Sequence, residues 1–448
     1  MNQAATISAA ARAQARDLLA FIDASPSPWH AVRECERRLQ AAGFSRLEES
    51  ERWALAPGGC HYTVRGGASL IAFCVGANAA EAGGLTLLGA HTDSPGLRLK
   101  PRPAEDAAGV RRLGVEVYGG PILATFADRD LSLAGRVNVR AGDGIESRLL
   151  RFEQPLLRLP GLAIHMNREV NEAGLKFNKQ TELPLILGAA TGDDAEAGFR
   201  RLLADKLGVA PADLLTWELA AWDTQQGAFW GAEQEFIASA RLDNLASCHA
   251  ALGALLAVGT PARICPDTCM LALFDHEEVG SESAAGAGGS FVADVFARLA
   301  ASAGLDAEDQ RRMLARSFFI SADMAHAWHP GFPAAYDPGH RVQVNGGPVI
   351  KHNANRRYGT DADSAARFMR ICERAGVPCQ HYAHRSDLPC GSTIGPVVAA
   401  RLGLACVDIG SPLWAMHSIR ESAGVLDHAY LSAALTEAFK DQGGAAAR

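Results

Sequence analysis

The chain has 448 residues, which is more than one hydrophobic core usually supports, so we expect two domains. Hydrophobic residues make up 48% and charged residues 21% of the chain, an ordinary composition for a soluble globular protein. The net charge of -7, without any basic block, argues against nucleic acid or an anionic membrane as the main partner.

Ten scattered cysteines form no C-x-x-C pair, which favours reduced, mostly buried thiols over a disulfide framework or a thiolate zinc site. Arg12, Arg16 and Asp17 interrupt the alanine-rich start of the chain, so we expect no secretory signal peptide. No apolar stretch approaches the length that crosses a bilayer. These features together predict a cytoplasmic protein.

The N-terminal segment predicts two helices and a strand. Residues 8–23 carry apolar side chains on one helical face, and Pro26 and Pro28 then break the pattern. A second helix is predicted over 31–42 and a strand over 67–75.

A short apolar run over 85–90 predicts a buried strand that ends at His91 and Asp93. The H-x-D spacing suits a metal-binding imidazole supported by a nearby carboxylate. The alternative is a hydrogen-bonded loop histidine, which the spacing alone does not exclude.

The pattern changes between residues 100 and 235. Apolar and polar residues alternate over 115–118 and 131–139, as in half-buried strands, and short strands are also expected over 156–159 and 162–165. A helix is predicted over 195–207. We expect an inserted domain rich in antiparallel strands, with a role in assembly.

After residue 236 the α/β pattern returns. Asp243 precedes an apolar helical run, so it is either a helix cap or a ligand at a helix N-terminus. The apolar run 270–274 then predicts a buried strand that ends at Asp275, His276, Glu277 and Glu278. A solvated acidic loop is the alternative to a functional glutamate pair.

Two more strands are predicted to end at polar residues. The strand over 317–321 leads to Asp323, and the strand over 404–409 leads to His417 before a last helix over 423–439. Ligands in open α/β sheets bind at the carboxyl ends of the strands, so these residues are placed to meet.

The residues expected at or beside strand ends are two histidines and four carboxylates: His91, Asp243, Glu277, Glu278, Asp323 and His417. Nitrogen and oxygen ligands without thiolate favour zinc, with manganese or cobalt as alternatives. Two such ions bridged by a carboxylate polarise a carbonyl and share a hydroxide, and the spare glutamate moves the proton.

Seven motifs in this sequence closely resemble the aspartyl aminopeptidase family of co-catalytic zinc peptidases, in the family's order and over nearly the whole chain. They are S-P-S-P-W-H-A-V at 25–32, G-A-H-T-D-S-P at 89–95, R-L-D-N-L at 241–245, D-H-E-E-V-G-S-E-S at 275–283, S-A-D-M-A-H-A at 321–327, N-G-G-P-V-I-K at 345–351 and M-H-S-I-R-E at 416–421.

The resemblance implies an α/β/α sandwich catalytic domain over residues 1–99 and 236–448, with a β-rich oligomerisation domain inserted over 100–235. It implies two Zn²⁺ per subunit, with His91 and Asp323 on one ion, Glu278 and His417 on the other, and Asp243 bridging. Glu277 is then the general base, and Asp93 supports the site. His276 departs from the asparagine common at this position, which leaves the pKa of the base open.

The resemblance also implies that the enzyme removes N-terminal Asp or Glu from peptides. Lys351 is the candidate cation for the substrate carboxylate, and Tyr358 and His326 are candidates to stabilise the oxyanion. The family forms dodecamers built from dimers, in which a histidine matching His165 reaches a neighbour's active site. His249 and His329 are expected to be structural.

Two alternatives stay open at this point. An enzyme of the same fold could prefer neutral residues such as leucine, which an assay of aspartyl against leucyl substrates would decide. A metal-free scaffold that kept the fold and lost turnover is the other alternative. Metal analysis with a Glu277→Gln variant would separate it from an enzyme.

Overall fold

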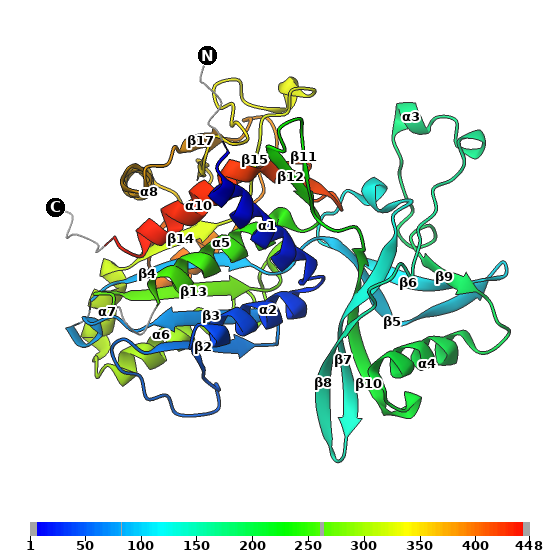
Figure 1. Cartoon of the computed structure of the whole chain (residues 1–448), viewed down its shortest axis with the longest axis horizontal. Helices are drawn as coiled ribbons and strands as arrows, with labels where there is room; N and C mark the ends of the chain where they lie inside the picture. Colours follow the sequence, from blue (N-terminus) through cyan, green and yellow to red (C-terminus); the bar gives the residue numbers. More distant parts are fainter. Residues whose placement is uncertain (1–6, 82, 260–263, 442–448) are drawn as a thin grey trace.

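A computed structural model describes residues 7–81, 83–259 and 264–441 of the chain. A mixed nine-stranded sheet forms the centre of the larger region (Figure 1). In spatial order its strands are β1 (Ser45–Arg46), β2 (Cys60–Arg65), β3 (Ser69–Cys74), β13 (Thr268–Phe274), β4 (Leu85–His91), β14 (Phe318–Ala322), β18 (Ala405–Gly410), β16 (Val349–His352) and β17 (Gln380–Ala383).

Helices cover both faces of this sheet, which makes the region an α/β/α sandwich (Figure 1). One core contains residues from α1 (Ala9–Asp23), α2 (Pro28–Ala41), α5 (Leu242–Val258), α8 (Ala362–Ala375) and α10 (Val425–Ala438). The other core contains residues from α6 (Phe291–Ser302), α7 (Ala307–Arg316) and α9 (Ile394–Leu402). The central strands β13 and β4 are buried along their whole length because both faces are covered.

A second, six-stranded sheet lies beside the sandwich and has a core of its own (Figure 1). Its antiparallel strands, in spatial order, are β8 (Gly144–Arg151), β7 (Leu131–Ala141), β10 (Leu214–Asp223), β5 (Gly96–Ala107), β6 (Val110–Tyr118) and β9 (Leu185–Ala189). This region also contains α3 (Val170–Ala173) and α4 (Ala195–Leu207), and Phe199 and Leu203 of α4 are buried in its core.

A third, small sheet contains five short strands. They are β11 (Ala228–Trp230), β12 (Phe236–Ser239), β20 (Glu421–Gly424), β19 (Pro412–Trp414) and β15 (Ala325–His326). Because β12 directly precedes α5 and β20 directly follows the His417 loop, this sheet holds two segments of the candidate site together.

Most predicted elements are present, and three expectations are wrong. The helix α2 begins at Pro28, not at residue 31, because proline is tolerated in the first turn of a helix. The two short strands expected over 156–159 and 162–165 are absent from the described structure, since the first segment forms only isolated β-bridges and Ile164–Met166 form an exposed 3₁₀ turn. Cys60 and Cys74 are directly opposite each other on β2 and β3 and form a disulfide, so not all ten thiols are reduced.

Among the described helices, none is both long and apolar enough to cross a bilayer.

Candidate active site

Three neighbouring parallel strands end at the same edge of the large sheet. Phe274 of β13 pairs with His91 of β4, and Ser321 of β14 pairs with Gly89 of β4, so the residues that follow each strand emerge together. His91 itself is the last residue of β4 and is buried. The strand register therefore brings His91, the glutamate pair and Asp323 to one place.

Asp243 comes from the start of α5, where the backbone is not yet helical. Its peptide bond to Asn244 is cis, and the Asn244 side chain donates to the Ala322 carbonyl at the end of β14 (2.9 Å). The sequence left a helix cap open as the role of Asp243, but this carboxylate points to histidines instead of the helix backbone.

The five predicted ligands form a continuous chain of contacts in which carboxylates and imidazoles alternate. His91 Nε2 lies 3.4 Å from Asp243 Oδ1 and 3.5 Å from Asp323 Oδ1. His417 Nε2 lies 3.5 Å from Asp243 Oδ2 and 3.5 Å from Glu278 Oε1. Asp243 thus stands between the two imidazoles with one oxygen toward each.

The oxygen atoms of this cluster are short of hydrogen-bond donors. Asp243 Oδ1 and Glu278 Oε1 are buried and accept no hydrogen bond from any residue that the structure describes. Ligand atoms of His91, Asp243 and Glu278 all lie within 4.8 Å of one another, as metal ligands would. Buried carboxylates without donors are costly unless a cation neutralises them, so the cluster fits divalent metal ions.

The electrostatics of the cluster show the same shortage of positive charge. Burial and the neighbouring carboxylates Asp323, Asp93 and Asp243 raise the pKa of Glu277 to about 7. Burial lowers the pKa of His417, but Asp243 and Glu278 raise it more, to about 10. Unlike the three carboxylate ligands, Glu277 has no histidine contact among the described ion pairs. Its raised pKa allows it to exchange a proton near neutral pH.

Asp93 supports the cluster from behind. Its carboxylate accepts hydrogen bonds from the backbone N–H groups of Glu277 (3.2 Å) and Glu278 (3.1 Å) and from the Tyr118 hydroxyl (2.7 Å). His91 Nδ1 lies 3.0 Å from the Asp93 carbonyl oxygen, which fixes the imidazole with Nε2 toward the cluster. Asp93 therefore orients both glutamates and the first histidine.

Glu421 has a similar supporting role that the sequence did not reveal. It is buried and accepts hydrogen bonds from the backbone N–H groups of Asp243 (3.0 Å) and His417 (2.7 Å). Burial raises the pKa of Glu421 to about 8. It belongs to the quoted motif at 416–421, but nothing in the local pattern distinguished it or Tyr118 from ordinary structural residues.

Three of the predicted substrate residues lie together beyond Asp323. Lys351 is buried, with Nζ 3.4 Å from Asp323 Oδ2 and 5.5 Å from the centre of the Tyr358 ring. Burial lowers the pKa of His326 to about 4, so its imidazole is neutral. Burial also raises the pKa of Tyr358, which keeps the phenol protonated.

His165 is separate from this group. It is exposed on the 3₁₀ turn Ile164–Met166 of the smaller region, close in sequence to α3, which projects away from the sandwich in Figure 1. None of the described contacts joins it to the cluster within one chain. His276 turns away as well, because its Nδ1 lies 2.8 Å from Ser283 Oγ.

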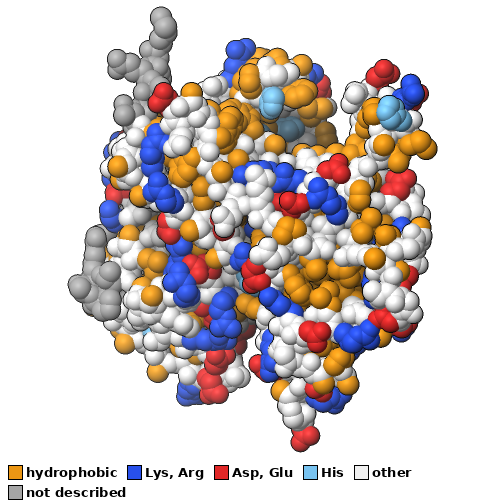
Figure 2. All heavy atoms as spheres, turned by 45° about the vertical axis from the view of Figure 1, so that its right-hand side comes forward, with side chains coloured by type: hydrophobic (Ala, Val, Ile, Leu, Met, Phe, Trp, Pro, Cys, Tyr) orange, Lys and Arg blue, Asp and Glu red, His pale blue; other side chains and the backbone are white. Residues whose placement is uncertain are grey.

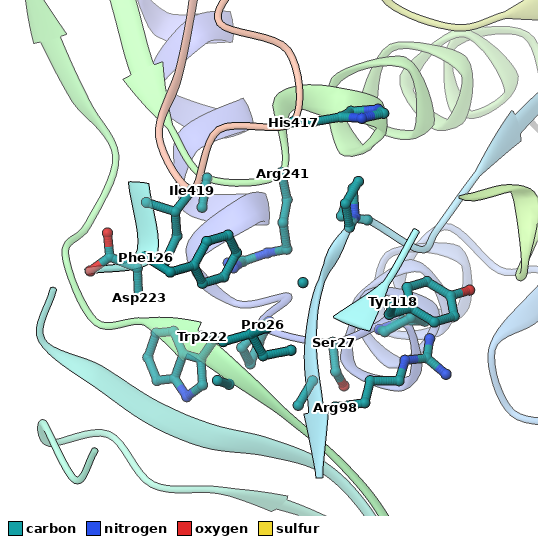
Figure 3. Close-up of a pocket in the computed structure, with 18 of the residues that line it drawn as sticks. Pro26, Ser27, Arg98, Tyr118, Phe126, Trp222, Asp223, Arg241, His417 and Ile419 are labelled. Carbon is teal, nitrogen blue, oxygen red and sulfur yellow. The ribbon is translucent and has the colours of Figure 1, made fainter. Parts of the chain in front are cut away.

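A small cavity of about 60 Å³ lies between the two regions and is lined by Asp243 and His417 at one end. Figure 3 shows Arg241 extending from beside His417 toward Phe126 and Trp222, while Tyr118 lies on the other side of the cavity. The cavity has room for a few water molecules. His326, Lys351 and Tyr358 are not among its described lining residues, so it is a separate space from theirs.

Known proteins resemble this chain over nearly its full length. Residues 21–439 match the family model described as aminopeptidase I zinc metalloprotease (M18). A probable M18 family aminopeptidase 2 of Azotobacter vinelandii is 47% identical over 423 residues, which cover 94% of this chain and 96% of the relative.

Solved structures agree with the sequence comparison. A cryo-EM structure of the Ape4 and Nbr1 complex contains a chain with 35% identity and a TM-score of 0.93, covering 98% of this chain and 88% of that one. The structure of the S. cerevisiae mApe1 dodecamer has 27% identity and a TM-score of 0.84, covering 96% of this chain and 97% of the other.

Proposed function

The chain belongs to the M18 family of aminopeptidase I zinc metalloproteases and is a metalloaminopeptidase of that family, and we propose that it removes N-terminal Asp or Glu from peptides. The observation that carries the metal-dependent chemistry is the position of Asp243 between two imidazoles, with one carboxylate oxygen toward each. This arrangement suits a carboxylate that bridges two cations.

We assign the metal ligands as the sequence predicted them. His91 and Asp323 would hold one Zn²⁺, Glu278 and His417 the other, and Asp243 both, with Mn²⁺ or Co²⁺ as possible occupants. When bound, such ions polarise the scissile carbonyl and lower the pKa of water.

Glu277 would carry the proton. Burial raises the pKa of the Glu277 carboxyl, and this group is placed to accept a proton from the attacking water and to give it to the departing amine. Asp93 would keep this carboxylate in place, since it binds the backbone N–H of Glu277 and that of Glu278. The neutral imidazole of His326 and the protonated phenol of Tyr358 are each able to donate a hydrogen bond to the oxyanion.

Lys351 supports the acidic preference. A buried ammonium 3.4 Å from Asp323 stands beside the proposed metal site, where the side chain of the N-terminal residue would enter. With Asp323 serving as a metal ligand, the ammonium would be free to pair with a substrate carboxylate. A buried charge pair of this kind contributes strongly to discrimination, because an apolar substrate leaves the ammonium unpaired.

A comparison of substrates tests this specificity. We expect Lys351→Met to lower the ratio of kcat/KM for aspartyl over leucyl substrates by about 30-fold or more, equivalent to about 2 kcal/mol. Lys100→Met, on the smaller sheet, is the matched control. An unchanged ratio in Lys351→Met would refute the role of Lys351, and a wild-type preference for leucine would refute the acidic specificity.

We also propose that residues 100–235 serve assembly into a dodecamer built from dimers, and the mApe1 structural relative is a dodecamer. Leu162, Ile164 and Met166 are exposed apolar side chains around His165, which suits burial against another subunit. His165 would then reach a neighbour's active site. Dissociated subunits should be nearly inactive, and a fully active monomer on a sizing column would contradict the proposal.

A further inference from the structure

Two histidines form a pair at the edge of the large sheet, apart from the candidate active site. His352 is the last residue of β16, and His381 is the second residue of β17, the edge strand. His352 Nε2 lies 2.9 Å from His381 Nδ1, with the ring centres 5.2 Å apart. Neither residue is among those that the proposed mechanism uses.

The strand register explains why the two imidazoles meet. β16 and β17 are parallel, with Ile350 opposite His381 and Lys351 opposite Tyr382. Side chains alternate along a strand, so His352 and His381 share the face of Ile350, while Lys351 is on the other face with Tyr382. Because the backbone of both strands is hydrogen-bonded, the imidazoles are held close together by rigid elements.

The two nitrogens are close enough for one ion to bind both. Two nitrogens bound at about 2.05 Å to one ion and at right angles to each other are about 2.9 Å apart. Two nitrogens bound to a tetrahedral ion are about 3.3 Å apart, so the two rings would have to move further from each other. The observed 2.9 Å is also the length of an N–H···N hydrogen bond, and ring centres 5.2 Å apart place the two rings end to end, so each ring has to turn before one ion binds both. Cu²⁺ and Ni²⁺ bind such nitrogen ligands more tightly than the earlier divalent metals of the first transition row.

We propose that His352 and His381 form a second metal site, which takes one Cu²⁺ or Ni²⁺ ion from solution with water in its remaining positions. The site is accessible, because His381 is exposed and His352 lines an open hollow of about 550 Å³ together with Asn353, Arg357 and His384. This site is independent of the proposed substrate specificity.

The exchange of ligands balances without any redox step. In the neutral pair one imidazole donates its N–H to the other across the 2.9 Å gap. When the ion binds, that imidazole moves its proton to the other ring nitrogen, so both facing nitrogens have free lone pairs. Two metal–nitrogen bonds form, two metal–water bonds and one hydrogen bond break, and no proton is released.

The histidines around His352 determine the pH at which metal binding is best measured. Burial lowers the pKa of His352, and the neighbouring His381 and His340 lower it further. His340 Nδ1 lies 2.8 Å from Asp337 Oδ1, so its own imidazole is already paired with a carboxylate. Metal binding is therefore to be measured at pH 7.5, well above the lowered pKa of His352.

The experiment uses the zinc-loaded full-length protein and one to three equivalents of Cu²⁺, measured by electron paramagnetic resonance and by isothermal titration calorimetry. The variants are His352→Ala and His381→Ala, and His329→Ala is the matched control. His329 is a half-buried histidine in the same region whose ring faces Phe332, without a second imidazole as ligand. Circular dichroism checks that each variant is folded.

We expect wild type and His329→Ala to bind one equivalent of Cu²⁺ more than either His352→Ala or His381→Ala, with coupling to two nitrogens in the lost signal. Copper that displaces zinc in the active site appears equally in all four proteins. Equal copper binding in all four would overturn the proposal, as would loss of the signal in only one of the two variants. Activity on aspartyl substrates should stay unchanged in both variants.

Discussion

Two clusters of histidine and carboxylate involve different positions of the same helix, α5. Asp243 at its start belongs to the cluster with His91 and His417, whereas His249, further along, belongs to a cluster with Asp17 and His428. The residue types are similar in the two clusters. Their hydrogen bonding differs, and this difference separates a functional site from a structural one.

In the second cluster the carboxylate has its donors. Both oxygens of Asp17 accept hydrogen bonds from Arg38 (2.8 and 2.9 Å), and Oδ2 is also 2.9 Å from His249 Nε2. His249 Nδ1 in turn lies 2.9 Å from His428 Nε2. In the first cluster, Asp243 Oδ1 and Glu278 Oε1 accept no hydrogen bond from the described part of the chain. The incomplete cluster is therefore the one that requires a cation.

The largest difference between the clusters should appear when one carboxylate loses its charge. Glu277→Gln removes the proton carrier and should lower kcat by about 10²–10⁴-fold while metal content and Tm stay near those of wild type. Glu282→Gln, an exposed glutamate in the same segment, is the matched control and should keep full activity. If Glu277→Gln kept more than a tenth of the activity, Glu277 would not be the base.

Removal of one supporting hydrogen bond gives a smaller effect. Tyr118→Phe deletes the hydroxyl that donates to Asp93 at 2.7 Å and should lower metal affinity or kcat/KM by about 10–100-fold. Tyr62→Phe is the control, since Tyr62 is also fully buried but accepts its hydrogen bond from Gln40. Equal activity of the two variants would show that Asp93 needs no support from the smaller sheet.

In the structural cluster, the same kind of change should affect stability alone. Asp17→Asn breaks the pairing with Arg38 and His249 and should lower the free energy of unfolding by only about 1 kcal/mol, because Asp17 is exposed and solvent screens the pair, as measured by urea denaturation. Its kcat/KM at 25 °C should equal that of wild type. A loss of activity in the folded variant would contradict the division between the two clusters.

The smallest effect concerns pH. Burial lowers the pKa of His428 well below its usual value, and His249 adds to this. Below about pH 6.5 the unfolded chain binds a proton at this position that the folded chain does not, so stability falls as pH falls, by at most about 1.4 kcal/mol per pH unit. His428→Leu should reduce this slope between pH 6.5 and pH 5, measured by urea denaturation. An unchanged slope would contradict the assignment, and measurements at pH 8 supply the reference.

The sequence predicted the strand ends well because buried parallel strands have a strong local pattern. The apolar runs before His91 and Glu277 stop abruptly at ionisable residues, and the structure shows these residues at one edge of the sheet. The distances among His91, Asp243 and His417 also agree with the predicted convergence.

Long-range contacts explain what the sequence could not show. Tyr118 reaches Asp93 from another sheet, and Glu421 acts through two backbone N–H groups, so neither has a local signature. The pairing of Cys60 with Cys74 depends on the register of β2 and β3, which cysteine spacing does not encode. The metal pair His352 and His381 depends on strand register in the same way.

Anomalous diffraction from crystals of the zinc-loaded protein tests the central claim most directly. We expect two zinc peaks per chain on either side of Asp243, one beside His91 and Asp323 and the other beside Glu278 and His417, with Glu277 bound to neither ion. A single peak, no peak at Asp243, or direct coordination by Glu277 would contradict it.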